Sequence, residues 1–360
     1  MMRRILVAGL LATAVVAMPQ AVSAQASAQA SPRETAAIRA QASLTALRKH
    51  EERMIAIGDR MLRAAGAAGW CDASQSLGWT LGELGQYPKE LRQHVRTVWN
   101  LPDGAVLFVS AVAPDGAAAR AGIRAGTGIA LLDGMQPMRN HLQEPSRHAL
   151  ANSERLIDEA LARGPLSIEA IDSAGVRSTI ALTGELACAS RFELSAEDEE
   201  QAYADGSLVQ VTAGMGRYTD GRDDELAGVI AHEIAHNMLR HIPRSQEAGT
   251  PNDYRRYLGR YARISRKMEE EADRLAVWLL AVAGYDPEAP LRFWQRFGPN
   301  NDSAHPFGRL HDPWRTRVAS IQDELAIMRA AKAVDPDARP ALLEQRNADD
   351  TPVGPSPAPR

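Results

Sequence analysis

The sequence lacks an excess of basic charge and any long apolar run. Its 41 lysines and arginines are outnumbered by 45 aspartates and glutamates, which gives a formal net charge of -4. This balance gives no reason to expect nucleic acid as a partner. No apolar run is as long as the roughly 20 residues that a membrane-spanning helix needs. We therefore expect neither nucleic-acid binding nor a stable membrane span.

Cysteine is scarce, and the common nucleophile motifs are missing. The chain has only 2 cysteines, Cys71 and Cys188, and neither lies in a recognisable nucleophile motif. No Gly-x-Ser-x-Gly elbow of the lipase type occurs. These absences leave no rival active site of the covalent-nucleophile kind.

The first residues predict export. Arg3 and Arg4 precede an apolar run over residues 5–18, and small residues follow up to Ala24. This order is typical of a signal peptide, here over residues 1–24. We expect a periplasmic protein, or alternatively a secreted one. Residues 25–33, mostly Ala, Ser and Gln, are expected to be disordered.

One short stretch carries the chemistry. Residues 232 to 236 read His-Glu-Ile-Ala-His, and on a helix His232 and His236 share a face with Glu233 beside them. This spacing indicates a zinc site with a built-in base, the alternative being two core histidines. Asp223 can cap the helix and Pro243 can end it. The apolar residues at helical spacing are Leu226, Val229, Ile230 and Ile234.

A candidate third ligand follows downstream. Glu269 and Asp273 are one helical turn apart on a predicted helix. The Glu269 carboxylate can complete a set of two histidines and one glutamate, which leaves the fourth position of zinc to water. Glu270 and Glu271 then point elsewhere, and we expect them on the solvated surface.

These motifs resemble those of the gluzincin metallopeptidases of the HtpX and BepA kind, from about Tyr203 to Ile321. The resemblance implies a mainly helical zincin-type domain with a small edge sheet. It implies that one zinc ion per chain is bound by His232, His236 and Glu269. It also implies that Glu233 is the catalytic base and that Asp273 braces a ligand histidine.

The resemblance also points to an auxiliary histidine. The family carries a histidine six residues before an arginine, and His311 with Arg317 keeps that spacing. His305 is the alternative, because His305-Pro306 keeps the family's His-Pro dipeptide. We favour His311 as a catalytic residue that stabilises the oxyanion or controls access to zinc.

Residues 76–185 resemble a PDZ domain of the kind attached to HtrA proteases. Strands, turns and one helix alternate there, although Thr127-Gly128 replaces the family's acidic residue after a glycine. By this resemblance, a peptide's terminal carboxylate binds the backbone N–H groups of a loop while the peptide adds a strand. The loop residues would be Leu77, Gly78 and Trp79. The alternative is a degenerate domain that only supports the peptidase.

Cys71 and Cys188 flank this region almost symmetrically. An inserted domain has its two ends close together, and an oxidising compartment permits disulfides. We therefore expect a Cys71–Cys188 bond, the alternative being two buried free thiols.

The sequence predicts an α+β protein with an inserted, mostly β domain. Residues 34–72 should form a helix that packs on the peptidase domain, which should cover residues 189–334. The Pro-, Ala- and Asp-rich residues 335–360 should be a disordered tail. Residues 254–268 predict an amphipathic helix with a basic face, the alternative being a membrane-surface patch.

The functional hypothesis is an exported zinc endopeptidase that cleaves unfolded or misassembled envelope proteins in quality control. One alternative is a binding or chaperone-like protein that captures exposed C-termini and has a latched or weakly active peptidase fold. A third is a processing protease with a single substrate. The sequence predicts no oligomeric state.

Overall fold

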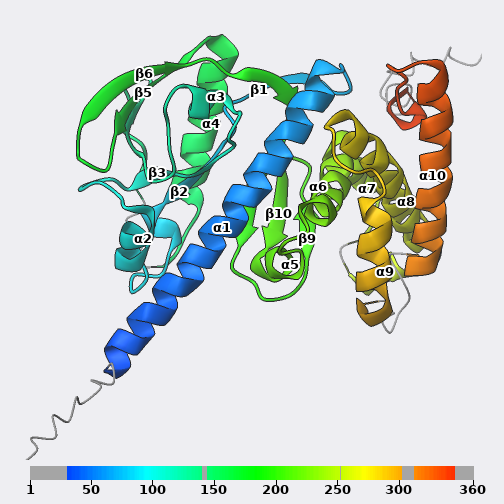
Figure 1. Ribbon diagram of the computed structural model, residues 1–360, viewed down its shortest axis with the longest axis horizontal. Coiled ribbons are helices and arrows are strands. Elements are labelled where there is room, and N and C mark those ends of the chain that lie inside the picture. The colour runs from blue at the N-terminus through cyan, green and yellow to red at the C-terminus, as the bar shows by residue number, and fades with distance from the viewer. Residues whose placement is uncertain (1–30, 140–143, 252, 302–311, 345–360) are drawn as a thin grey trace, which may run out of the picture.

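The computed structural model describes residues 31–139, 144–251, 253–301 and 312–344. Its architecture is α+β, as the sequence predicted. One long helix, α1 (Pro32–Ala67), crosses the molecule diagonally in Figure 1, with a β-rich part on one side and a helical part on the other. The predicted signal peptide over residues 1–24 lies outside the described residues.

Helix α1 begins earlier than the sequence predicted. Ser31 caps it in a reciprocal box with Glu34, and Pro32 occupies the first turn, where its missing N–H costs nothing. Residues 32 and 33, expected to be disordered, therefore belong to the helix.

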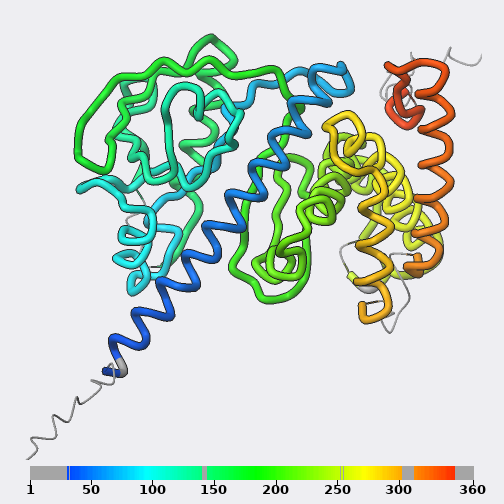
Figure 2. The backbone as a smooth tube through the Cα atoms, in the orientation of Figure 1, coloured from blue at the N-terminus to red at the C-terminus, as the bar shows by residue number. Residues whose placement is uncertain are grey.

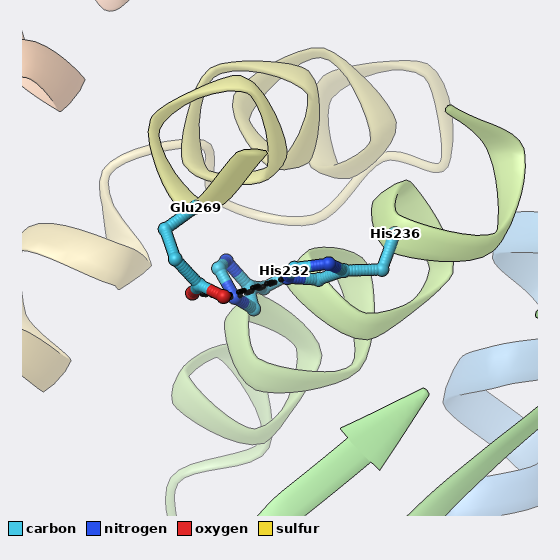
Figure 3. Close-up of side chains that lie close together, drawn as sticks. All are labelled: His232, His236 and Glu269. Carbon is cyan, nitrogen blue, oxygen red and sulfur yellow. Dashed lines mark hydrogen bonds and ion pairs between the residues drawn. The ribbon is translucent and has the colours of Figure 1, made fainter. Parts of the chain in front are cut away.

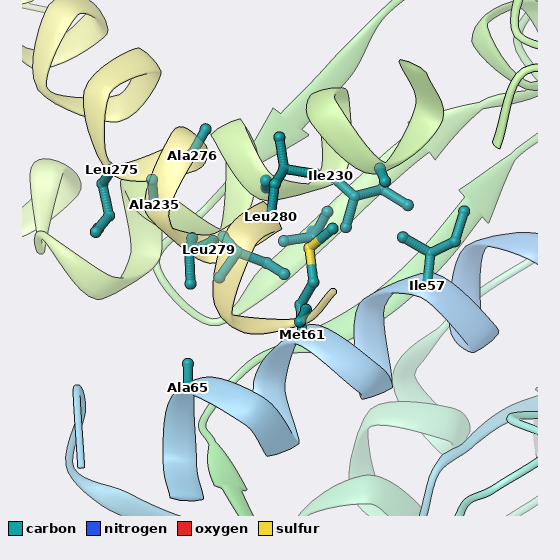
Figure 4. Close-up of a cluster of buried hydrophobic side chains, with 14 of the residues drawn as sticks. Ile57, Met61, Ala65, Ile230, Ala235, Leu275, Ala276, Leu279 and Leu280 are labelled. Carbon is teal, nitrogen blue, oxygen red and sulfur yellow. The ribbon is translucent and has the colours of Figure 1, made fainter. Parts of the chain in front are cut away.

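The apolar face of α1 is buried against the helical part. Met54, Ile57 and Met61 are at most 4% exposed. Figure 4 shows Ile57, Met61 and Ala65 of α1 meeting side chains of α6 (Asp223–Met238) and α8 (Gly259–Val282). This shared core fixes the first helix to the two helices that carry the site.

The β-rich part is a five-stranded antiparallel sheet in the order β2-β3-β4-β5-β6. It has a core of its own, built from residues such as Leu107, Ile129 and Ile168. Its strands are β2 (Trp79–Glu83), β3 (Leu107–Val112), β4 (Gly128–Leu132), β5 (Leu166–Ile171) and β6 (Arg177–Leu182). Its helices are η1 (Leu84–Gln86), α2 (Arg92–Trp99), α3 (Ala117–Arg120) and α4 (His148–Arg163).

The chain enters and leaves this part at one place. Strand β1 (Ala73–Ser76) pairs antiparallel with β7 (Glu185–Cys188), and Figure 2 shows the returning chain beside the end of α1. Cys71 and Cys188 are bonded there, with Cα atoms 5.6 Å apart. The disulfide closes the neck of the β-rich part.

A three-stranded sheet connects this neck to the helices. Its order is β8-β10-β9, with β10 (Leu208–Thr212) parallel to β8 (Arg191–Ser195) and antiparallel to β9 (Ala202–Ala204). Asn237 of α6 accepts a hydrogen bond from Gly206 N at 2.8 Å and donates one to Ser190 Oγ at 3.0 Å. These bonds tie the connecting loops of the sheet to helix α6.

The remaining helices surround α6 and α8. They are α5 (Ala213–Tyr218), α7 (His241–Glu247), η2 (Tyr254–Tyr257), α9 (Ala289–Asn301) and α10 (Trp314–Val334). Within the ranges that the structure describes, no helix combines the length and apolar character needed to cross a membrane.

The sequence predicted a disordered tail from residue 335, but the structure shows packed residues beyond that point. Leu342 and Leu343 are 5% and 1% exposed and belong to the main core. Composition alone pointed to disorder, but two leucines in this polar segment suffice to anchor residues 335–344. Residues 345–360 lie outside the described part.

Candidate active site

Helix α6 presents the His-Glu-x-x-His residues toward a cleft. Its first turn is acidic, which suits the positive end of a helix. Arg222, not Asp223, occupies the N-cap position. The helix ends before Pro243, because Arg240 takes a left-handed conformation with φ 55°. His241 therefore begins α7 and does not continue the zinc helix.

Helix α8 brings the third residue to the same point. His232 Nε2 lies 3.0 Å from His236 Nε2 and 3.2 Å from Glu269 Oε2. His236 Nε2 lies 3.6 Å from Glu269 Oε1. Figure 3 shows the carboxylate of Glu269 and the two imidazoles converging from α8 and α6. The structure thus brings the three predicted ligands together.

This donor set fits zinc. One ligand atom from each of the three residues lies within 4.8 Å of the other two. Two imidazole nitrogens with one carboxylate form a catalytic zinc set that leaves a coordination position open. The three side chains are also partly buried, at 15 to 16% exposure, which shields the charges from solvent.

His232 is held by a carboxylate and a guanidinium. Its Nδ1 lies 3.0 Å from Asp273 Oδ1, and Arg317 donates to both oxygens of Asp273 at 2.7 Å. An Nδ1–H donated to Asp273 leaves Nε2 free to bind metal. Burial lowers the pKa of His232, but its bonds to Asp273 and Glu269 outweigh burial and raise it to about 10.

His236 is held by a different chain of side chains. Its Nδ1 lies 2.9 Å from Nδ1 of His241, whose Nε2 lies 3.2 Å from Glu271 Oε2. Arg244 donates to the same oxygen at 2.8 Å. Burial lowers the pKa of His241 to about 4, so its neutral ring accepts from His236 and donates to Glu271 at pH 7.

Glu271 corrects a prediction. It is 7% exposed, although we expected a solvated carboxylate, whereas Glu270 is exposed as expected. Burial raises the pKa of Glu271, but bonds to His241 and Arg244 lower it to about 2. Its closest partners, His241 and Arg244, lie on α7, so the spacing of residues along α8 could not reveal them.

Glu233 lies in the cleft beside the three ligands. It is 9% exposed, and burial raises the pKa of its carboxyl. The cleft has a volume of about 720 Å³ and is also lined by β9 and by Phe293, Trp294 and Phe297 of α9. Among the described strands, none pairs with the outer edge of β9. The Glu233 carboxylate, the three candidate metal ligands and the outer edge of β9 thus lie in one cleft.

The sequence also predicted an auxiliary histidine and a peptide-binding loop. His311 and its alternative His305 fall outside the described residues. Leu77 and Trp79 line a second cleft. None of Leu77, Gly78 and Trp79 lines the cleft of Glu233.

Three residues with clear positions in the site were not predicted to act there, namely Arg317, His241 and Glu271. The only signals in the sequence were the spacing of Arg317 from His311 and the Arg240-His241 pair that follows the motif.

Comparisons with known proteins agree with this geometry. Residues 181–253 match the family model described as Peptidase family M48. The Beta-barrel assembly-enhancing protease of Escherichia coli (strain K12) is 28% identical over 165 residues, which are 38% of this chain and 34% of that protein. The Mitochondrial metalloendopeptidase OMA1 of Arabidopsis thaliana is 26% identical over 151 residues, 36% of this chain and 31% of that protein.

The chain spans about a third of the length of the curated relatives it matches. The matched segment contains His232, Glu233 and His236, and the structure adds Glu269 from outside it. The family match, the relatives and the site together support a metallopeptidase with a domain similar to Peptidase family M48.

Proposed function

We propose that this protein is an exported zinc-dependent endopeptidase of the gluzincin type that cleaves unfolded or misassembled envelope proteins. The observation that carries the proposal is the convergence of His232, His236 and Glu269 beside Glu233. The name of the bacterial relative refers to β-barrel assembly, which supports a role in envelope quality control. The Cys71–Cys188 bond and the predicted signal peptide support the periplasm.

His232, His236 and Glu269 would hold zinc, which when bound polarises a carbonyl and lowers the pKa of water to about 7. Glu233 takes the proton of the attacking water and passes it to the leaving nitrogen. The raised pKa of Glu233 suits both steps. A group that acts first as a base and then as an acid works best when its pKa is close to the operating pH. The free edge of β9 can pair with an extended substrate backbone.

The test is Glu233→Gln in the full chain. We expect the variant to keep zinc, measured by elemental analysis, and to lose cleavage of a denatured fluorescent casein by about 100- to 10,000-fold. Glu270→Gln is the matched control, because Glu270 is exposed and lies next to the ligand Glu269. We expect this variant to cleave casein as fast as the wild type does. A Glu233→Gln variant as active as the wild type would reject the proposal.

A chelator separates the peptidase from the binding-protein alternative. Wild-type cleavage should stop with 1,10-phenanthroline and return with added zinc. Suppression of casein aggregation without any cleavage, with or without chelator, would instead indicate a chaperone-like protein.

We also propose that residues 76–185 form a PDZ-like peptide-binding domain. Its support is a five-stranded antiparallel sheet in which β2 is the outermost strand, with α4 in contact with β2. Gly78 has φ 68° in the turn before β2, a conformation that favours glycine.

A further inference from the structure

A second cleft lies between the β-rich part and the helices. It has a volume of about 370 Å³, at the lower end of the 300–1,000 Å³ that is common for ligand pockets. It is lined by β2, by α4, by one face of α1 and by the chain from Cys188 to Phe192. The cleft is therefore shared between the PDZ-like region and the peptidase part.

The loop before β2 is poorly suited to a terminal carboxylate. Gly78 N already donates to Ser76 Oγ at 3.0 Å, and that hydroxyl donates to Asp59 Oδ1 at 2.6 Å. A Cβ placed on Gly78 would lie 3.2 Å from Asp59 Oδ2, so a carboxylate of α1 stands against the loop. Arg63 pairs with Asp59 at 2.7 Å, so the obstacle to a second carboxylate is the N–H group of Gly78, which is already engaged by Ser76.

Helix α4 adds acidic side chains to the opposite wall. Glu154 is 20% exposed, and its nearest cation is Arg147 at 3.8 Å. Arg147 is itself engaged by Glu193. Asp158, one turn further along α4, pairs with Arg191. Glu154 is thus a partly buried carboxylate in the cleft, and the two cations that act on it, Arg147 and Arg191, are each engaged by another carboxylate. Burial raises its pKa.

Part of the remaining surface of the cleft is apolar, and the cleft also includes a strand edge. Leu62, Leu81 and Leu161 line it, and among the described strands none pairs with the outer edge of β2. The cleft thus offers a strand edge, a group of leucine side chains and the carboxylate of Glu154. A matching ligand has an extended backbone that pairs with β2, apolar side chains that contact the leucines and a cation that pairs with Glu154.

We infer that this cleft binds a short extended peptide segment carrying a lysine or arginine that pairs with Glu154, and that it does not require a free C-terminus. The inference rests on the proposed peptide-binding role of residues 76–185. It names the ligand class as basic, apolar internal segments of a protein chain. Such segments become accessible when a protein unfolds, so the cleft would recognise the same state that the peptidase site would cleave.

The test uses the full zinc-loaded chain in a Glu233→Gln background, so that bound peptides are not cut. Fluorescence anisotropy would compare Leu-rich octapeptides, acetylated and amidated, that carry a central Lys, Gln or Glu. We expect the Lys peptide to bind roughly tenfold more tightly than the Gln peptide, because a charge-assisted bond is lost. Glu154→Gln should remove this preference. Glu159→Gln, on the same helix but 50% exposed and paired with Arg155, should not.

Three outcomes would overturn the inference: binding only with a free carboxylate, equal affinity for the Lys and Gln peptides, or no binding of any peptide. The peptide comparison needs no variant of Glu154, so a folding defect in Glu154→Gln leaves the test intact. Cleavage of casein by the wild type, measured separately, shows whether the peptidase proposal fails at the same time.

Discussion

At the residue scale, the two candidate histidine ligands are oriented by different partners. His232 faces the Asp273–Arg317 pair, and His236 faces His241, which in turn faces Glu271. Both arrangements hold the Nδ1 edge of the ligand and turn Nε2 toward the cleft. Groups that orient ligands in this way often affect metal affinity nearly as much as the ligands do.

His241→Ala should therefore weaken zinc binding by about 10- to 100-fold, because His236 loses the acceptor of its Nδ1–H. Competition with a chromophoric chelator measures the affinity without any substrate. His241→Asn should recover part of the loss, because the Asn carbonyl can accept at nearly the position of Nδ1. Exposed His148→Ala is the control, and an unchanged zinc affinity in His241→Ala would show that His241 does not position His236.

The pKa of His232 predicts how zinc binding responds to pH. With a pKa of about 10 in the metal-free protein, the ring is protonated at pH 8 and must lose that proton to bind metal. Binding should release about one proton from this residue, and zinc affinity should rise with pH until the pH passes the pKa. Calorimetry in buffers of different ionisation enthalpy measures the release. A binding enthalpy that is the same in all buffers would contradict this prediction.

At the element scale, the relative position of α8 and α10 matters to the site, because each helix supplies one residue of an ion pair that holds His232. Asp273 lies on α8 and Arg317 on α10. About two turns further along α10, Glu324 accepts from Trp278 Nε1 at 2.7 Å and from Arg274 Nε at 2.6 Å. Glu324 is 4% exposed, so this contact is shielded from water.

Glu324→Ala should lower the free energy of unfolding by about 3 kcal/mol, because it leaves a buried indole N–H and a guanidinium without their acceptor. The estimate is at the low end for buried pairs, since Arg274 is 31% exposed. Urea denaturation measures the change. Asp323→Ala, at the exposed neighbouring position, is the control, and equal stability of both variants would disprove the structural role of Glu324.

The break between α6 and α7 shows why an element boundary matters to the site. In a continuous helix, residues five apart point about 140° away from each other. His241 reaches His236 only because Arg240 leaves the helical conformation. The motif predicted the helix correctly, but the interaction depends on where that helix ends.

At the scale of the whole molecule, α1 joins the two parts. Its Met54, Ile57 and Met61 belong to the core of the helical part. On the other side, Glu51 accepts a hydrogen bond from Ser110 Oγ of β3 at 2.7 Å. The disulfide at the end of α1 adds a covalent link at the neck of the β-rich part.

Removing this link should destabilise the protein. The bond joins residues 117 apart, and the chain-entropy account gives roughly 5 kcal/mol for a closed loop of that size. A Cys71→Ser, Cys188→Ser double variant should unfold at lower temperature, and reductant should lower the unfolding temperature of the wild type alone. Thiol labelling of the unreduced, unfolded wild type is the direct check, and two reactive thiols there would refute the bond.

The sequence by itself determined those features of the site that depend on the spacing of residues within one helix. The spacing of His232, Glu233 and His236, and that of Glu269 and Asp273, follows from the period of a single helix, so it could be read without a fold. The packed Leu342 and Leu343 could not, because composition averages over a segment and does not show what covers it.

Only the tertiary structure decided the partners across the chain. It placed Glu271 against His241 and Arg244, and it set Asp59 of α1 against the loop at Gly78. These residues are 19 or more positions apart in the sequence, so no local period relates them. Their contacts exist because burying the apolar faces of α1, α6 and α8 in one core fixes the positions of the polar side chains at its edges.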